Sequence, residues 1–600
     1  MVLHPIDWII AALCILICFL PALAFGRRSG KNTAEFFASG RSVPWWLAGI
    51  SLVATTFSSD TPNLVANIVR TQGVAGNWQW WAFTLTGVAT VFFYARLWRR
   101  SGVLTDLEFY ELRYSGRSAS AVRGFRAVYL GLLFNCMIMA TVDLAACKIA
   151  SVLFGLSRWE TLLAVGLLNV VFAAHSGLWG VLVIDMFQFF IKMAAVIAAA
   201  YFAVELPQVG GMSGLVAKLS HTPGPGGLNF LSMLPDFRNT WDLAVAVFIM
   251  PLAVQWWAVW YPGAEPGGGS YVAQRMLASR SEKDSLGGTL FFNLAHYVLR
   301  PWPWILVGLA SLIVYPTVQD IQIAFPHVDK SLLGPDIAFP AMLKFLPAGW
   351  IGLMVGGLVA ANSSTILSHL NWGASYLVHD FYRRFLRPKE TEKHYVFAGR
   401  MATILLFVLS SALVFFLQTA QESFYLILQV GAGTGLLYLL RWFWWRITAW
   451  CEIAAMVSSF VISVIFFVAG RRGHVVTTDM QLLFTVIGTT ICWVIVAYAG
   501  PQTDPKTLID FYHKVRPFGP GWRRIRIEAG VSAAEAAKWA RTDNIPLALL
   551  GWAMGTTVIW ASLFTVGNFL YGRMGYAVGL LAVSIVSGAM LIWVVKRLWR

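Results

Sequence analysis

The sequence has few charged residues. Asp, Glu, Lys and Arg together make up only 12% of its 600 residues, whereas soluble globular domains carry about 25%. Hydrophobic residues make up 58% of the chain. These proportions exclude a soluble globular protein and predict an all-α polytopic membrane protein, because long apolar runs cross a bilayer as helices.

Cysteines and polar segments are also scarce. The six cysteines all fall in apolar runs and form no CxxC pair, which excludes a disulfide framework or a zinc site as the organising feature. Three segments are too polar to cross a membrane, namely 206–240, 317–346 and 501–544, and each is too short for a catalytic domain. The sequence pairs no catalytic carboxylates and shows no nucleophile with a base, so we expect no enzyme.

Apolar runs of about 20 residues are expected to be membrane spans. An odd number of spans places the two termini on opposite sides of the membrane. The sequence predicts fifteen, near residues 8–26, 44–70, 77–99, 126–154, 158–175, 177–205, 241–261, 287–316, 347–382, 396–419, 423–441, 446–470, 481–499, 545–569 and 577–597.

The net charge of +16 follows this topology. One alternating set of loops, with the C-terminal tail, holds 33 of the 45 Lys and Arg residues, and the other set holds nine. Cytoplasmic loops are enriched in Lys and Arg. We therefore expect a multi-pass protein of the plasma membrane, a bacterial inner membrane in particular, with the N-terminus outside and the C-terminus in the cytoplasm. The basic charge then gives no reason to expect a nucleic acid partner.

The span at 44–70 has a polar centre. Hydroxyl side chains, Asp60 and Pro62 are crowded between Thr55 and Asn63. Non-helical backbone at membrane depth is tolerated only where it is buried in protein or lines a cavity, and broken helices form the ion and solute sites of secondary transporters. We interpret this span as a broken helix. The alternative is a kinked helix whose hydroxyls bond back to their own carbonyls.

A second interrupted span is predicted at 347–382. Its residues Ala361, Ser364, Thr365 and Ser368 are spaced i, i+3, i+4 and i+7, which aligns them on one helix face. Facing the carbonyls freed between Ala54 and Phe57, their oxygens could form a cage for a singly charged cation. The alternative is an ordinary contact between membrane helices, which small and hydroxyl residues also favour.

Other polar side chains lie in apolar surroundings. Asp185 is an isolated carboxylate in the run VLVIDMFQFF, which suggests an ion path; a satisfied interfacial Asp is the alternative. Asp143 and Lys148 are five residues apart and make a poor pair within one helix. We expect each of them to face the bundle interior; the alternative is an ion pair with another helix. The amides of Gln79, Gln255 and Gln429 are each compatible with ordinary helix packing.

Three ordered motifs resemble the sodium:solute symporter family over about residues 35 to 450. They are GRSVPWWLAGISLVATTFSSD at 40–60, GGGSYVAQRMLASRSEKDS at 267–285 and AANSSTILSHLN at 360–371. The resemblance implies a transporter core at 41–445 with ten helices in two inverted five-helix repeats, about 41–205 and 241–445, as in the bacterial leucine transporter. Residues 1–40 would form a peripheral helix and a cytoplasmic loop, and 446–600 peripheral helices with the cytoplasmic segment 501–544.

The resemblance also implies a Na⁺ site and a role for one carboxylate. Na⁺, as the coupling ion, would be bound by the backbone carbonyls of Ala54, Phe57 and Ala361 and the hydroxyls of Ser364 and Thr365. Asp185 matches the carboxylate that is linked in the family to the exit of sodium toward the cytoplasm.

The family's solute pocket maps onto six residues of this chain: Asp60, Thr61, Gln79, Asp143, Gln255 and Gln429. Their hydrogen-bonding groups favour a polyhydroxylated solute. The two acids Asp60 and Asp143 could equally indicate an amino group on it.

We therefore predict a symporter that uses sodium to import a sugar or an amino-sugar-like solute by alternating access. Its partners would be the solute, sodium ions and the lipid bilayer, and it would function as a monomer. The alternatives are proton coupling, an amino acid or organic acid as the solute, and a transporter-like membrane sensor.

Overall fold

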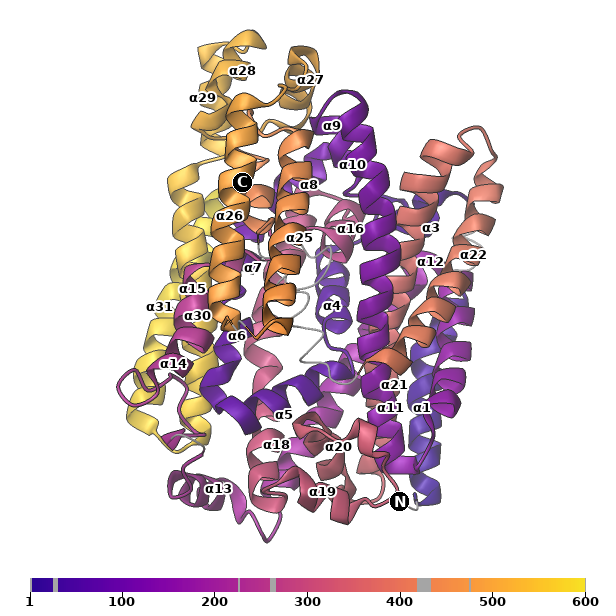
Figure 1. Cartoon of the computed structure of the whole chain (residues 1–600), viewed down its shortest axis with the longest axis vertical. Coiled ribbons are helices and arrows are strands. Elements are labelled where there is room, and N and C mark those ends of the chain that lie inside the picture. The colour runs from indigo at the N-terminus through magenta and orange to yellow at the C-terminus, as the bar shows by residue number, and fades with distance from the viewer. Residues whose placement is uncertain are drawn as a thin grey trace.

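The protein is helical throughout the part that the structure describes. This computed structural model describes residues 3–24, 31–224, 227–258, 266–417, 433–473 and 476–598. Within these ranges the sole β pairing is an isolated parallel bridge between Val43 and Ser279. The long helices run roughly side by side along the tall axis of the molecule (Figure 1).

The first half of the chain contains the polar break. Their bounds are α1 (Pro5–Leu23), α3 (Thr33–Ala38), α4 (Trp45–Thr55), α5 (Asp60–Gln72), α6 (Trp78–Trp81), α7 (Thr84–Ala89), α8 (Ala95–Ser101), α9 (Glu108–Arg113), α10 (Gly116–Val128), α11 (Asn135–Phe154), α12 (Arg158–Val204), α13 (Gly211–Ser220), α14 (Trp241–Ala244), α15 (Met250–Ala253) and α16 (Ser270–Ala278).

The second half begins with helices that pack on the first half and ends with an outer group. Their bounds are α17 (Glu282–Leu294), α18 (Pro301–Val314), α19 (Val318–Ala324), α20 (Ala338–Met342), α21 (Trp350–Ser375), the π-helix η12 (Tyr376–Leu386), α22 (Glu392–Leu413), α24 (Gly435–Leu440), α25 (Ala449–Arg471), α26 (Thr478–Ala499), α27 (Pro505–Val515), α28 (Arg523–Glu528), α29 (Ala533–Thr542), α30 (Ile545–Leu570) and α31 (Met574–Leu598).

Nine helices of the described residues are long and apolar enough to cross a membrane, fewer than the fifteen predicted spans. Three more apolar helices, Pro5–Pro21, Trp45–Thr55 and Trp241–Ala253, are shorter. The difference arises partly because some predicted spans are broken, and because much of the predicted span at 423–441 lies outside the described residues.

Two of the predicted interruptions are present. The span at 44–70 ends as a helix at Thr55 and resumes at Asp60, with four non-helical residues between. Pro62 lies in the first turn of α5, where its missing N–H needs no helical partner. The predicted boundary between 158–175 and 177–205 is a kink at Gly177, whose φ of 57° and ψ of −161° suit glycine and few other residues.

The predicted interruption of the span at 347–382 is wrong. Helix α21 is continuous from Trp350 to Ser375 and then continues as η12, which has π-helical hydrogen bonds. The hydroxyls of Ser364 and Thr365 do not open the helix, because they bond to a neighbouring helix or back to their own turn. Thr365 does both, since its Oγ1 donates to the carbonyls of Thr55 and Ala361.

Helix α1 packs against α12 and α21 and caps α21. The carboxylate of Asp7 accepts hydrogen bonds from the backbone N–H groups of Gly349 (2.6 Å) and Gly352 (3.1 Å). A negative charge is favourable at a helix N-terminus, where unpaired N–H groups gather. The helix predicted to be peripheral is thus fixed to the N-terminal end of α21.

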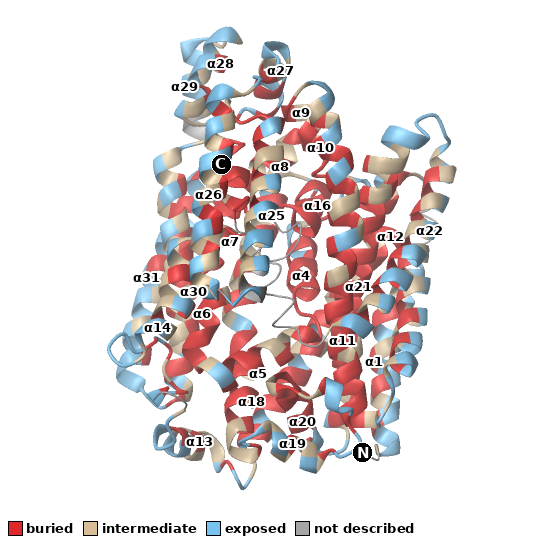
Figure 2. Ribbon diagram, in the orientation of Figure 1, coloured by how far each residue is buried: buried red, intermediate tan, exposed pale blue. Residues whose placement is uncertain are grey.

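The two ends of the molecule differ in their elements. The N-terminus lies at one end with α13, α19 and α20, and α27, α28 and α29 lie at the other end (Figure 1). Buried residues are concentrated on the inner helices α4, α16 and α21, while α28, α29 and α13 show much exposed surface (Figure 2). The polar break therefore lies in the buried middle of the bundle.

Candidate functional site

The last four residues of α4, Leu52 to Thr55, present their carbonyls at the break. Each of them finds a donor. Leu52 O accepts from the backbone N–H of Thr56 (3.2 Å), and Ala54 O from that of Phe57 (3.1 Å). Val53 O accepts from Arg300, and Thr55 O from the hydroxyl of Thr365 (2.7 Å). Thr56 and Phe57 of the break thus bond back to α4, while Arg300 and Thr365 bond to its end from other elements.

The hydroxyl face of α21 lies directly against this break. Besides the bond from Thr365 to Thr55 O, the hydroxyls of Thr55 and Ser368 lie 2.9 Å apart. Ala361, Ser364 and Thr365 are at most 1% exposed. The face of α21 that carries the predicted Na⁺ ligands therefore meets the end of α4 at Thr55.

Asp185 of α12 lies beside the same residues. Its Oδ1 accepts a hydrogen bond from Ser364 Oγ (2.6 Å), and its Oδ2 accepts one from Ser51 Oγ of α4. The carboxylate is fully buried. Asp185 thereby links α12 to both α4 and α21. It accepts the hydroxyl proton of Ser364, one of the predicted Na⁺ ligands.

Lys192 is a member of this site that sequence reasoning missed. Its Nζ donates hydrogen bonds to Ala54 O (2.8 Å) and Phe57 O (3.0 Å), two of the three carbonyls predicted to bind Na⁺. It is 1% exposed. One signal was available: Lys192 follows Asp185 by seven residues, so both lie on one face of α12.

Arg300 holds the other side of the break. Its Nη1 donates to Val53 O (3.2 Å) and to Thr56 Oγ1 (3.1 Å), and it also contacts His296, whose Nδ1 lies 3.1 Å from Thr56 Oγ1. Cations are favourable at the C-terminus of a helix, where the carbonyls carry partial negative charge. Lys192 and Arg300 both exploit this at the end of α4.

Arg275 belongs to the site as well, although it lies between the predicted spans at 241–261 and 287–316. It is fully buried in α16 and donates from Nη2 to Ser368 Oγ (2.7 Å) and from Nε to Ser51 Oγ (3.2 Å). Its Nη2 lies 3.8 Å from Asp185 Oδ2. The polar run around 270–285 thus includes a short buried helix, α16.

The predicted solute residues fall into separate groups. Asp60 accepts from Ser58, whose hydroxyl lies 3.1 Å from that of Thr61. Gln255 Nε2 donates to the backbone carbonyl of Gln79 (2.8 Å). Gln429 lies outside the described residues.

Asp143 is placed beside the break but bonded to α21. Its Oδ1 accepts from Asn362 Nδ2 (2.9 Å), while the neighbouring Val142 carbonyl accepts from Ser59 of the break (3.0 Å). Its second oxygen, Oδ2, is buried and has no hydrogen-bond partner among the described residues. An unpartnered buried carboxylate oxygen is uncommon, so this atom is an available acceptor.

Lys148, on the same helix α11, has a structural partner instead. Its Nζ lies 2.7 Å from Asp336 Oδ2, and both side chains are at most 2% exposed. Asp336 belongs to the segment 317–346, which the sequence analysis recognised as too polar to span. This ion pair fixes that segment to the bundle.

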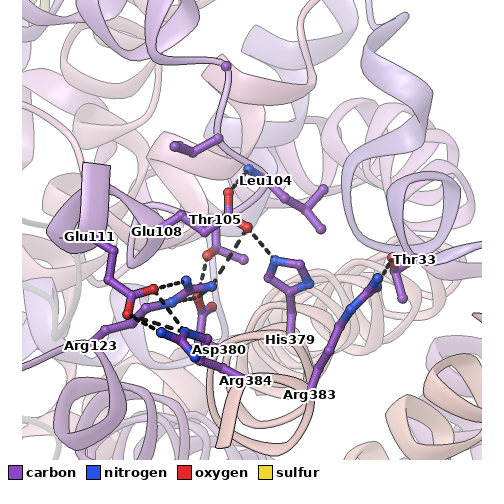
Figure 3. A network of polar contacts seen from close by, with 12 residues as sticks. Thr33, Leu104, Thr105, Glu108, Glu111, Arg123, His379, Asp380, Arg383 and Arg384 are labelled. Atoms are coloured by element: carbon purple, nitrogen blue, oxygen red, sulfur yellow. Dashed lines mark hydrogen bonds and ion pairs between the residues drawn. The ribbon is translucent and has the colours of Figure 1, made fainter. Parts of the chain in front are cut away.

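A charged network connects α9, α10 and η12 (Figure 3). Arg123 of α10 donates to Glu111 (2.6 Å) and to Asp380 of η12 (2.8 Å). Arg384 of η12 also pairs with Glu111 (3.0 Å). The network joins the continuation of α21 to α9 and α10, away from the break.

The chain matches a known protein family. The family model described as "Sodium:solute symporter family" matches residues 36–461, well over half of the chain. The chain belongs to the sodium:solute symporter family. The match covers the break, α12, α16 and α21, the elements that form the site.

Curated members of this family resemble the chain over most of its length. A sodium/glucose cotransporter of Vibrio parahaemolyticus is 24% identical over 494 residues, which is 79% of this chain and 87% of the relative. A human sodium/myo-inositol cotransporter is 23% identical over 535 residues, covering 82% of this chain and 76% of the relative. These relatives are transporters rather than enzymes.

A solved structure shares the fold. A substrate-bound, outward-open structure of a Na⁺-coupled sialic acid symporter matches with a TM-score of 0.66 at 18% identity, covering 84% of this chain and 99% of that one. The chain is thus an all-α polytopic membrane protein with the leucine-transporter-like fold that the sequence predicts. Na⁺ as the coupling ion agrees with the family and with this neighbour.

Proposed function

We propose that this protein is a secondary active symporter that uses the sodium gradient to import a small polar solute, a sugar or an amino-sugar-like compound, by alternating access. The observation that carries the proposal is the meeting of the opened second span with the hydroxyl face of α21 beside Asp185. Oxygen groups gathered at a helix break are typical of secondary transporters. The sugar and inositol relatives support the solute class.

The proposed driving force is sufficient for uptake from dilute solution. One charge crossing a potential of roughly 100 mV supplies about 2.3 kcal/mol, and a tenfold sodium gradient adds about 1.4 kcal/mol. One sodium ion per solute would therefore support an accumulation of about 500-fold. The ion acts by binding one conformation of the site better than the other, since a ligand shifts an equilibrium only through such a difference.

We further propose that the two inverted repeats are about 41–205 and 241–445, with 1–40 and 446–600 as peripheral parts. The protein would lie in the plasma membrane as a monomer with its N-terminus outside. The solute pocket would contain Asp60, Thr61, Gln79, Asp143, Gln255 and Gln429. The available Oδ2 of Asp143 and the contact between Gln79 and Gln255 support this pocket.

Uptake into proteoliposomes tests the proposal. The full chain is reconstituted and offered radiolabelled glucose, mannose, myo-inositol, sialic acid, glucosamine and proline, with an inward gradient of sodium or of choline. We expect at least one sugar or amino sugar to accumulate with sodium and not with choline. Accumulation of proline alone, accumulation driven by a proton gradient without sodium, or no accumulation of any of these solutes would each contradict the proposed function.

A further inference from the structure

The cation site at the break contains an ammonium group supplied by the chain itself. Lys192 extends from α12 to the C-terminal end of α4, where its Nζ bonds to the carbonyls of Ala54 and Phe57. The same Nζ lies 5.2 Å from the centre of the Phe57 ring, within the range of a cation–π contact. Two carbonyls and an aromatic face are a complete environment for an ammonium ion.

A sodium ion shared by these two carbonyls would have to take the position of that ammonium group. Both cations carry one positive charge, and both would be attracted to the same carbonyl lone pairs at the negative end of α4. Two of the remaining predicted ligands lie close by: Thr365 bonds to the carbonyl of Thr55, the residue after Ala54, and Ser364 bonds to Asp185, on the same helix as Lys192. Lys192 therefore occupies part of the predicted sodium site and not a position beside it.

The surrounding charges do not favour a second cation. The charged groups packed around Lys192 and its carbonyls include Asp185 on its own helix, Arg275 on α16 and Arg300 at the start of α18. The one carboxylate among them already accepts bonds from Ser51 and Ser364. Adding sodium next to the ammonium would place like charges together in a buried site, which is unfavourable.

We propose that the Lys192 ammonium group and a sodium ion are mutually exclusive occupants of this one site, so that Lys192 is a tethered competitor that weakens sodium binding. This inference rests on the proposed sodium-coupled transport. The inference gives Lys192 a role in the affinity for sodium. It says nothing about the residues of the proposed solute pocket. For sodium to bind there, Lys192 would have to release the carbonyls of Ala54 and Phe57, and the bonds between these carbonyls and α12 would be lost.

Removal of the charge tests this competition. The probe is sodium chloride alone, titrated against choline chloride at constant ionic strength, and the readout is the thermal midpoint of the purified full chain, since a bound ion stabilises the fold by mass action. We expect Lys192→Met and Lys192→Gln to lower the sodium concentration for half-maximal stabilisation at least about tenfold, which corresponds to about 1.4 kcal/mol. Lys192→Arg keeps the charge and should retain the wild-type value.

Two controls separate competition from a structural effect. Lys218→Met removes a lysine charge from α13, outside the site, and should leave the sodium response unchanged. Adding Thr365→Ala to Lys192→Met should abolish the gain, because it removes a predicted sodium ligand. If one of the neutral variants fails to fold, the other gives the result.

An unchanged or weaker sodium response in the neutral Lys192 variants would overturn the inference, even if the wild-type protein accumulates sugars with sodium. A gain in sodium affinity in these variants, together with no solute uptake by the wild type, would instead support the inference and contradict the proposed solute function.

Discussion

At the scale of single residues, the centre of this protein is the end of one short helix. The carbonyls from Leu52 to Thr55 all accept hydrogen bonds, and two of the donors are buried cations. Desolvating a cation is costly unless it is well hydrogen-bonded, so Lys192 and Arg300 indicate a site with a strong need for positive charge. This is the same need that a sodium ion would meet.

The two acids of the proposed pocket give a prediction at this scale. We expect Asp60→Asn and Asp143→Asn to weaken solute binding more than sodium binding, because neither carboxylate contacts the predicted sodium oxygens directly in the structure. Titrations of uptake against solute and against sodium measure the two effects. A larger change in the sodium concentration for half-maximal uptake would contradict the pocket assignment.

The sequence pattern predicted the break but not the lysine that bonds to its carbonyls. Pro62, Asp60 and the hydroxyl cluster cannot easily continue a membrane helix, and this is visible in the sequence. Lys192 was missed because its partners are backbone carbonyls, which have no signature in a side-chain pattern. Arg275 was missed because its short helix, α16, lies between two predicted spans in a polar run.

At the scale of helices, the sequence pattern predicted which face of α21 is used but not whether the helix is continuous. Its Ser/Thr spacing correctly predicted a face directed at the break, yet it also suggested an interruption that is absent from Trp350–Ser375. The spacing of polar residues tells which face is used, because helix geometry is regular. Whether the hydroxyls open the helix depends on the partners they find, and these become known only from the packing of α4.

The ion pair between α11 and the segment 317–346 gives a second prediction. Breaking a buried pair by removing one partner costs about 3 to 5 kcal/mol, because the other charge is left uncompensated. We therefore expect Lys148→Met or Asp336→Leu to lower the thermal midpoint strongly. The double variant should recover much of the loss, and a double variant as unstable as the sum of the single ones would contradict a direct pairing.

The network at α9 gives a third prediction, on pH. Partial burial alone would raise the pKa of Glu111, but hydrogen bonds from Arg384, Ser120 and Arg123 lower it to about 2, below the ordinary value of about 4.3. A lowered carboxyl pKa adds stability above the unfolded-state pKa, and this stability is lost as the pH falls from about 4 toward 2.

The measurement compares thermal midpoints of the wild type and Glu111→Gln between pH 6 and pH 3. The wild type should be more stable at pH 6, and the difference should shrink toward pH 3. A constant difference over this range would show that the Glu111 charge contributes no stability.

At the scale of the whole molecule, the elements at the two ends predict its orientation. The segment with α13 lies at the end with the N-terminus, and α27 lies at the opposite end (Figure 1). With most Lys and Arg in the loops predicted to be cytoplasmic, α13 should face outward and α27 the cytoplasm.

Cysteine labelling tests this orientation. In a Cys492→Ala background, a membrane-impermeant maleimide should react in intact cells with Lys218→Cys on α13 and not with Lys514→Cys on α27. The opposite pattern would invert the proposed topology. Both positions should react once the membrane is permeabilised.

The most direct test of the central claim, a cation site between the break and α21, is the sodium dependence of solute uptake in Thr365→Ala. Thr365 donates to the break and faces the site, so losing its oxygen should raise the sodium concentration for half-maximal uptake, by about tenfold for a ligand worth about 1.4 kcal/mol. Ser364→Ala should act in the same direction. Unchanged sodium dependence in both folded variants would contradict the account.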